Sequence, residues 1–184
     1  AFENAIAVVM AMGGEEAGAR ALSLLARVNE RIGGYLFVKT VVNVILGALS
    51  YAIMLVLGIE FALFWSVLIA FLNYIPYIGS IIGVIFPVLL SLAQFGTLWM
   101  SGVVMIALTT AQMVVGGWLE PRMMGRAFNL SPFVVLLALA FWSTLWGLAG
   151  ALLAVPMTAS LVLVLAEIRA TRPLAVLLSA SGRV

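Results

Sequence analysis

The 184-residue chain contains no cysteine, no histidine and no aspartate, so all seven acidic residues are glutamates. Without cysteine no disulfide can form, and without cysteine and histidine the usual zinc ligands are missing. The same absences exclude serine-histidine-aspartate and cysteine-histidine catalysis, an aspartate pair and the HExxH motif of metalloproteases. We therefore expect a protein that is not an enzyme and that binds no metal and no cofactor.

Charged residues are also scarce, at 9% of the chain, whereas 65% of the chain is hydrophobic. The mean hydropathy is +1.26, and soluble domains carry about 25% charged residues. Several apolar runs approach or exceed the roughly 17 to 20 residues that a membrane-spanning helix needs. We interpret the chain as an all-α, polytopic membrane protein in contact with a lipid bilayer. Because no basic patch with interleaved aromatic residues occurs, we expect no nucleic acid partner.

One stretch inside the apolar region, residues 71–87 (FLNYIPYIGSIIGVIFP), combines two prolines with two glycines. Proline lacks a backbone donor and glycine weakens a helix, so this stretch cannot form one smooth spanning helix. In hydrocarbon, a broken backbone is tolerated only where protein or a water-filled cavity satisfies the freed polar groups. We therefore predict that the chain turns back here as a membrane hairpin, and that this turn forms part of a transport path.

Six apolar segments make up the expected transmembrane core, which we place at residues 37–170. They are 38–57, 61–74, 78–92, 98–119, 132–146 and 148–168. The second and third segments form the hairpin described above. The last two segments form a second hairpin, broken by glycine and proline, of loosely similar plan. We predict that paired interrupted segments of this kind lie near a substrate site.

The residues that flank this core carry much of the charge. Residues 1–36 are predicted to form an N-terminal amphipathic region, interrupted at Gly13 and Gly14, whose helix lies at the membrane interface. A helix packed against protein in solvent is an equal alternative. Residues 171–184 are predicted to form a tail that begins with a short helix. The chain does not start with methionine, and we expect additional N-terminal helices of the same protein to precede it.

Lysine and arginine are unevenly distributed among the loops. They occur before the first segment, in the loop at 120–131 and in the tail, but not in the loops at 58–60, 94–97 and 147. If 61–92 is a hairpin, all nine basic residues fall on one side of the membrane. Cytoplasmic loops collect basic residues, so we expect a cytoplasmic C-terminus.

Polar side chains around the break are the candidate substrate pathway. They are Asn73, Tyr74, Tyr77 and Ser80, together with Gln112 in the middle third of the segment 98–119. The alternative is that these groups only satisfy the broken backbone or pack against a neighbouring helix. We expect the prolines and glycines of the two hairpins to set shape without contacting substrate. These residues are Pro76, Gly79, Gly83, Pro87, Gly147, Gly150 and Pro156.

A small group of polar residues follows the segment 98–119. Glu120, Arg122 and Asn129 form a candidate gate or cation site at the pathway mouth. The alternative is that Glu120 and Arg122 are an interfacial pair that ends the helix. Since no acidic residue lies deep within any segment, the pattern favours a neutral polar substrate over a proton-coupled antiporter.

Three separated motifs resemble the autoinducer-two exporter family of bacterial permeases. They are FLNYIPYIGSIIGVIFPVLLSL at 71–92, Gln112 with EPRMMG at 120–125, and NLSPFVVLLALAFWSTLWGLAGALLAVP at 129–156; YLFVKT at 35–40 is also similar. The resemblance implies a homo-oligomeric permease of the bacterial cytoplasmic (inner) membrane that exports small molecules such as the quorum-sensing signal autoinducer two. Some family members are instead described as sodium/proton antiporters, so monovalent cations are a second expected partner. Family members are about twice this length.

Three functions follow from these patterns. The first is a permease subunit that exports small neutral or weakly polar molecules. The second is a monovalent-cation/proton antiporter of the same fold. The third is a membrane scaffold module that does not transport.

Overall fold

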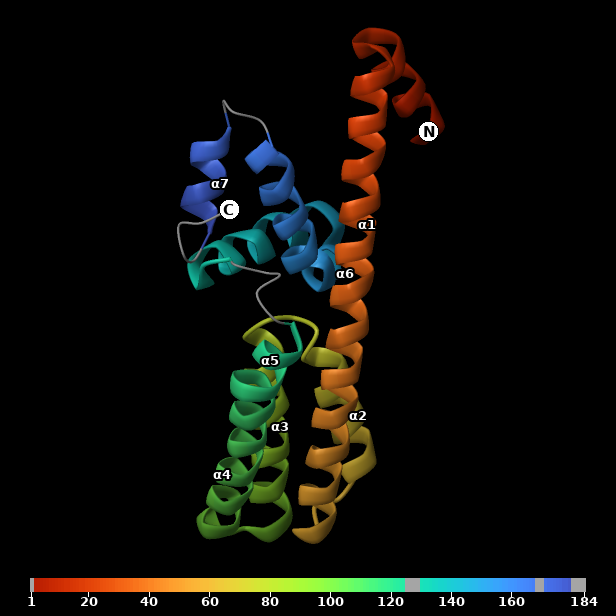
Figure 1. Ribbon diagram of the computed structural model, residues 1–184. Helices are drawn as coiled ribbons and strands as arrows, with labels where there is room; N and C mark the ends of the chain where they lie inside the picture. The colour runs from red at the N-terminus through yellow and green to blue at the C-terminus, as the bar shows by residue number, and fades with distance from the viewer. Residues whose placement is uncertain (1, 125–129, 168–170, 180–184) are drawn as a thin grey trace.

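The computed structural model describes residues 2–124, 130–167 and 171–179. Over these ranges the chain is helical and contains no strand beyond an isolated bridge between Leu130 and Ser179. The fold class predicted from composition is therefore confirmed: the chain forms an all-α protein with several long apolar helices. Figure 1 shows α1 as a long rod beside the remaining helices, which form two groups.

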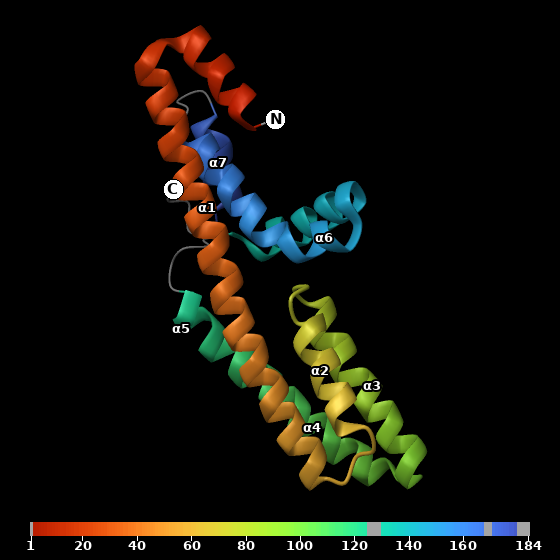
Figure 2. The same ribbon diagram turned by 90° about the vertical axis from the view of Figure 1, so that its right-hand side faces the viewer.

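α1 runs from Phe2 to Val56 as a single helix. The sequence pattern predicted an interruption at Gly13 and Gly14; the helix continues across both residues but does not continue straight (Figures 1 and 2). Glycine lowers helix stability by about 1 kcal/mol per residue but does not forbid the conformation. In Figure 2 the N-terminal end of α1 bends back from the rod, so the helix is continuous but not straight. No interruption separates residues 1–36 from the first apolar segment.

The first hairpin is formed by α2 (Ala62–Leu72) and α3 (Ile78–Phe95), which lie side by side. Its turn needs Gly79, because a Cβ atom there would lie 1.9 Å from the carbonyl oxygen of Leu72. Pro87 lies inside α3 and is completely buried. At Gly79, therefore, the turn depends on close backbone approach.

α4 (Leu98–Val114) continues through a π-helical turn, η1 (Val115–Leu119), into α5 (Glu120–Met124). The sequence predicted that Glu120 and Pro121 stop the helix, but it extends a further turn. Proline is tolerated in the first turn of a helix. The π-turn has already interrupted the regular hydrogen-bond ladder just before Pro121, so the missing donor disrupts less.

The second hairpin lies within α6 (Pro132–Glu167), which is broken at Trp146 and Gly147. Gly147 has φ 59° and ψ −136°, and the two arms fold back on each other in Figures 1 and 2. A Cβ atom at Gly150 would lie 1.9 Å from the carbonyl oxygen of Trp142, the same kind of contact as in the first hairpin. The short α7 (Arg172–Leu178) packs against α6.

The largest buried cluster joins α1, α2 and α4. Its fully buried members include Val42, Leu46, Ile69, Val104 and Leu108. Many large apolar side chains point outward instead; Trp99, for example, is 82% exposed. Among the described residues, four helical stretches are long and apolar enough to cross a membrane: Leu22–Val56, Ile78–Phe95, Leu98–Met124 and Pro132–Ala166. These outward surfaces are suited to lipid, since the chain has too few polar residues to cover them.

Candidate functional site

A cavity of about 800 Å³, here called the central cavity, lies between α1, the first hairpin, the α4–α5 rod and α6. It is lined by Asn73, Tyr77, Ser80 and Gln112, four of the five residues predicted for a substrate pathway. Pro76 and Glu120 also line it, whereas Tyr74 does not. Residues from four separate parts of the sequence therefore meet at one space. The side of the cavity towards α6 is apolar, because Val135 and Val155 form it.

The turn of the first hairpin presents its polar residues to this cavity in a strained conformation. The backbone N–H of Ile78 donates a hydrogen bond to the carbonyl of Pro76 at 2.7 Å, and Tyr77 between them has φ 63° and ψ −51°. This is a γ-turn of the rarer, positive-φ kind, which is unfavourable for a residue with a side chain. Strained residues cluster at functional sites. Ser80 donates from Oγ to the carbonyl of Tyr77 at 2.9 Å.

Two hydrogen bonds hold the same turn to α1. Asn73 Nδ2 donates to Asn43 Oδ1 at 2.8 Å, and both side chains are buried. One turn away on α1, Thr40 Oγ1 lies 2.6 Å from the hydroxyl of Tyr74. Tyr74 therefore anchors the turn to α1 from outside the cavity. Asn73 both lines the cavity and ties the turn to α1.

Gln112 projects from α4 towards the first hairpin. Its Nε2 atom is buried and has no hydrogen-bond partner among the described residues. The same atom would lie 3.4 Å from a Cβ atom at Gly83, so the glycine leaves room for the amide. An unpaired buried donor costs about 1–3 kcal/mol. Gln112 lines the cavity, and a ligand acceptor could pair with its Nε2 atom once the amide turns towards the cavity.

A partly buried ion pair lines the central cavity on the side of α5. Lys39 Nζ lies 2.5 Å from Glu120 Oε1, and the two side chains are 5% and 19% exposed. The sequence pattern suggested Arg122 as the partner of Glu120. Instead, Arg122 lies over the ring of Trp118, with its guanidinium carbon 3.8 Å from the ring centre. Asn129, the third member of the predicted gate, lies outside the described residues.

Sequence reasoning missed Lys39 as a site residue, because we counted it with the basic residues preceding the first segment. A positional signal was available. Polar residues recur every fourth position along α1, which places them on one face of a helix. They are Arg27, Arg31, Tyr35, Lys39 and Asn43.

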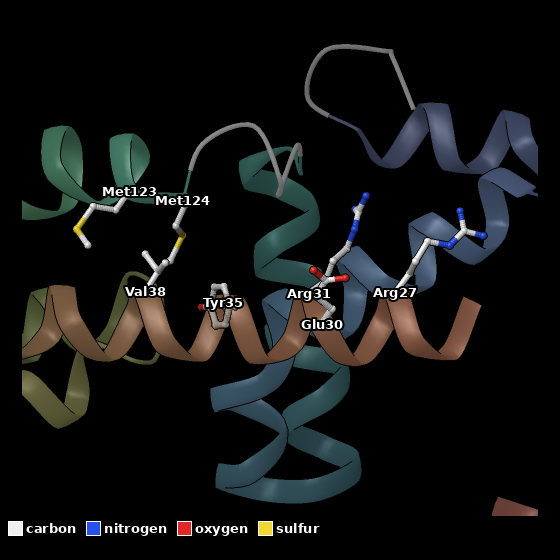
Figure 3. A pocket seen from close by; sticks show the side chains of 8 residues that line it. Arg27, Glu30, Arg31, Tyr35, Val38, Met123 and Met124 are labelled. Carbon is white, nitrogen blue, oxygen red and sulfur yellow. The ribbon is translucent and has the colours of Figure 1, made fainter. Parts of the chain in front are cut away.

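A second cavity, of about 530 Å³ and here called the arginine cavity, lies further towards the N-terminal end of α1. Figure 3 shows Arg27, Glu30 and Arg31 at one end of it and the methionines of α5 at the other. Tyr35 and Met124 line both this cavity and the central cavity. The two spaces therefore follow α1 one after the other and meet at these two side chains. Within the described residues, no cluster of three potential metal ligands occurs.

The chain is similar to several known transport proteins. Residues 6–170 match the model of the AI-2E family transporter. A relative from Escherichia coli K12, the AI-2 transport protein TqsA, is 36% identical over 158 residues, which cover 86% of this chain and 46% of the relative. A protein of Borreliella burgdorferi named "Putative transport protein" is 41% identical over 76% of this chain and 39% of its own length. The chain thus spans less than half the length of these curated relatives.

Proposed function

The chain belongs to the AI-2E transporter family, and from that premise we propose that it forms part of a permease that exports a small, polar, uncharged molecule. We further propose that it does so across the bacterial inner membrane with its C-terminus in the cytoplasm. The clustering of basic residues on one side of the predicted topology supports this orientation. The E. coli relative is named for AI-2 transport, so autoinducer two is the first substrate to test.

The observation that carries this proposal is the central cavity with its unpaired donor. Gln112 Nε2 is buried there without a partner among the described residues, and Tyr77, Ser80 and Asn73 line the same space. A molecule rich in hydroxyl or carbonyl groups would pair with these groups. Ligand sites of this kind are mostly apolar cavities in which a few polar groups fix orientation.

The charges around the central cavity favour an uncharged substrate. Its one described cation, Lys39, and its one described anion, Glu120, are bonded to each other. A charged ligand would have to compete with this pair, and truncating or displacing one partner of a buried pair is costly. Polar hydroxyl groups on the hairpin turn and the Gln112 amide remain as the groups that could recognise a substrate.

The second candidate function is cation/proton antiport, and one observation favours it. Glu120 is partly buried and lines the central cavity, so a carboxylate stands where a cation could pass. In this alternative a monovalent cation would replace Lys39 as the partner of Glu120. Intramembrane carboxylates often mark ion pathways.

Transport in proteoliposomes that contain the intact protein tests these proposals. We expect labelled autoinducer two to cross the membrane without a requirement for sodium. Gln112→Ala is expected to lower this rate about tenfold, the cost of one buried hydrogen bond in the transport path. Thr110→Ala is the matched control, because Thr110 lies two residues away on α4 outside the central cavity. Equal rates for the two variants would contradict the assignment of Gln112.

The antiport alternative predicts a different response. A pH gradient would respond to added sodium in wild-type vesicles, and Glu120→Gln would abolish that response. Homo-oligomerisation, which we propose on the family resemblance, is measured separately by native mass spectrometry of the intact protein. Unchanged export by Gln112→Ala, Tyr77→Ala and Asn73→Ala would instead favour a scaffold role.

A further inference from the structure

α1 and α5 are in contact where the two cavities meet. On α1, Tyr35 and Lys39 are four residues apart, and on α5 Glu120 and Met124 are also four residues apart. Residues at this spacing lie one above the other on a helix. Lys39 bonds to Glu120 on the side of the central cavity, and Tyr35 and Met124 line both cavities one turn further on. In Figure 3, Tyr35 follows the two arginines along α1, and Met124 of α5 lies beyond Tyr35 on the side away from them.

We infer that the central cavity and the arginine cavity are two compartments of one route, and that Tyr35 and Met124 form the gate between them, held closed by the Lys39–Glu120 ion pair. The inference rests on the proposed transport function, because a gate needs a cargo. The polar stripe along α1 supports it, since the stripe continues from Arg27 through Tyr35 to Lys39 past both cavities. Continuous polar lining is what a passing polar molecule requires in a membrane.

The backbone next to the ion pair supplies a place where the gate can move. The π-turn Val115–Leu119 lies directly before Glu120, and it contains Gly116 and Gly117. Single π-turns inside α-helices occur frequently at functional sites, and adjacent glycines weaken the helix. A change in this turn would move Glu120 and Met124 together, because both belong to α5. The ion pair would then break as the gap between the cavities opens.

The Lys39–Glu120 ion pair is strong enough to control the equilibrium between the closed and the open gate, but weak enough to be broken. Hydrogen bonds to charged groups contribute more than ordinary ones. Loss of the Lys39–Glu120 bond therefore changes the equilibrium constant for gate opening by about tenfold or more. Since Lys39 is nearly fully buried, removing only one partner leaves an unpaired charge, which favours opening towards water.

Thiol accessibility in the intact protein tests the gate without any transported cargo. These 184 residues contain no cysteine, so Thr109→Cys places one reporter thiol among them, on the wall of the central cavity. The neighbouring Thr110→Cys is the control, since Thr110 does not line that cavity. A membrane-impermeant maleimide is applied from the side that carries the basic residues, which is the cytoplasmic side in the predicted topology.

We expect slow modification of Thr109→Cys when the ion pair is intact. Combining it with Lys39→Glu or with Glu120→Lys should accelerate modification about tenfold. The charge-swapped double variant Lys39→Glu/Glu120→Lys should restore the slow rate, because the pair is rebuilt with its charges reversed. Recovery in the double variant also shows that the single variants do not act by unfolding the protein.

A second pair of substitutions tests the hinge. Gly116→Ala and Gly117→Ala add side chains that meet nothing within 4 Å, so they stiffen the turn without a clash. We expect them to slow the modification of Thr109→Cys further. Equal modification rates of Thr109→Cys in all these backgrounds, or a parallel rise at Thr110→Cys, would overturn the gate. If the thiol responds as expected but the protein moves no cargo, the opening between the two cavities is established and the proposed transport function is contradicted, so the two failures are distinguishable.

Discussion

Asn73, on the turn of the first hairpin, donates a hydrogen bond of 2.8 Å to Asn43 of α1, and both side chains are buried. This bond joins the wall of the central cavity to the long helix. The second amide hydrogen-bonding group of Asn43, Nδ2, has no partner among the described residues. The pair therefore fixes the position of the turn, but it buries an amide group without a partner, which costs free energy that an apolar contact would not cost.

Asn43→Ala should destabilise the protein by about 1–3 kcal/mol, because the buried Nδ2 of Asn73 loses its acceptor. The double variant Asn43→Ala/Asn73→Ala should cost less than the sum of the two single variants, since residues that share a bond are not additive. Thermal unfolding in detergent measures both effects. Asn29→Ala is the control, because Asn29 lies on the same helix and is exposed. Strict additivity would show that the two amides do not depend on each other.

Gly79→Ala and Gly150→Ala should each destabilise their hairpin by about 1–3 kcal/mol or more, the usual cost of overpacking. The added Cβ would lie 1.9 Å from a backbone carbonyl oxygen in either case, and a backbone atom cannot move aside as a flexible side chain can. Gly102→Ala on α4 is the matched control, since its Cβ meets nothing within 4 Å. That variant should be neutral or slightly stabilising. Thermal unfolding in detergent compares the three.

Tyr77→Gly should stabilise the backbone and at the same time reduce transport. Tyr77 holds a positive φ of 63°, where a side chain costs about 1–3 kcal/mol and glycine costs little. Phe61 offers the matched control, because it also has a positive φ (55°) but does not line the central cavity. Phe61→Gly should relieve strain and leave transport unchanged. Equal transport by the two variants would remove Tyr77 from the pathway.

Trp142→Phe should weaken the second hairpin by about 1 kcal/mol. The indole Nε1 of Trp142 donates to Thr158 Oγ1 at 2.9 Å, which joins the two arms of α6. Thr158→Val should cost a similar amount, and the double variant little more than either alone. Ser143→Ala is the control, since Ser143 donates a hydrogen bond to the carbonyl of Ala140 in its own arm. Urea or thermal unfolding of each variant in detergent supplies the comparison.

The hairpins could be predicted from sequence because glycine and proline act locally. Pro76 and Gly79 mark the first turn, and Gly147 and Gly150 mark the second, where the structure places both reversals. The continuity of α1 could not be predicted in the same way. Gly13 and Gly14 weaken a helix without forbidding it. Whether the helix continues depends on packing against the rest of the chain, and a local sequence pattern does not show that packing.

The residues of the candidate site were predictable only in part, for a related reason. Polar groups near the break, such as Tyr77 and Ser80, were identified because they interrupt an apolar run. Lys39 and Glu120 are 81 positions apart, so nothing in the local sequence of either residue indicates the other. The positive φ of Tyr77 also escaped prediction, because glycine is the residue expected at such a position.

α1 contacts α2, α4, η1, α5 and α6. It is therefore the only described helix that touches both hairpins and both parts of the α4–α5 rod. A small tilt of this helix would shift several walls of the central cavity at once, because α4, α5 and α6 line that cavity and contact α1. A ligand that binds the N-terminal end of α1 would then alter transport from a distance, without occupying the central cavity.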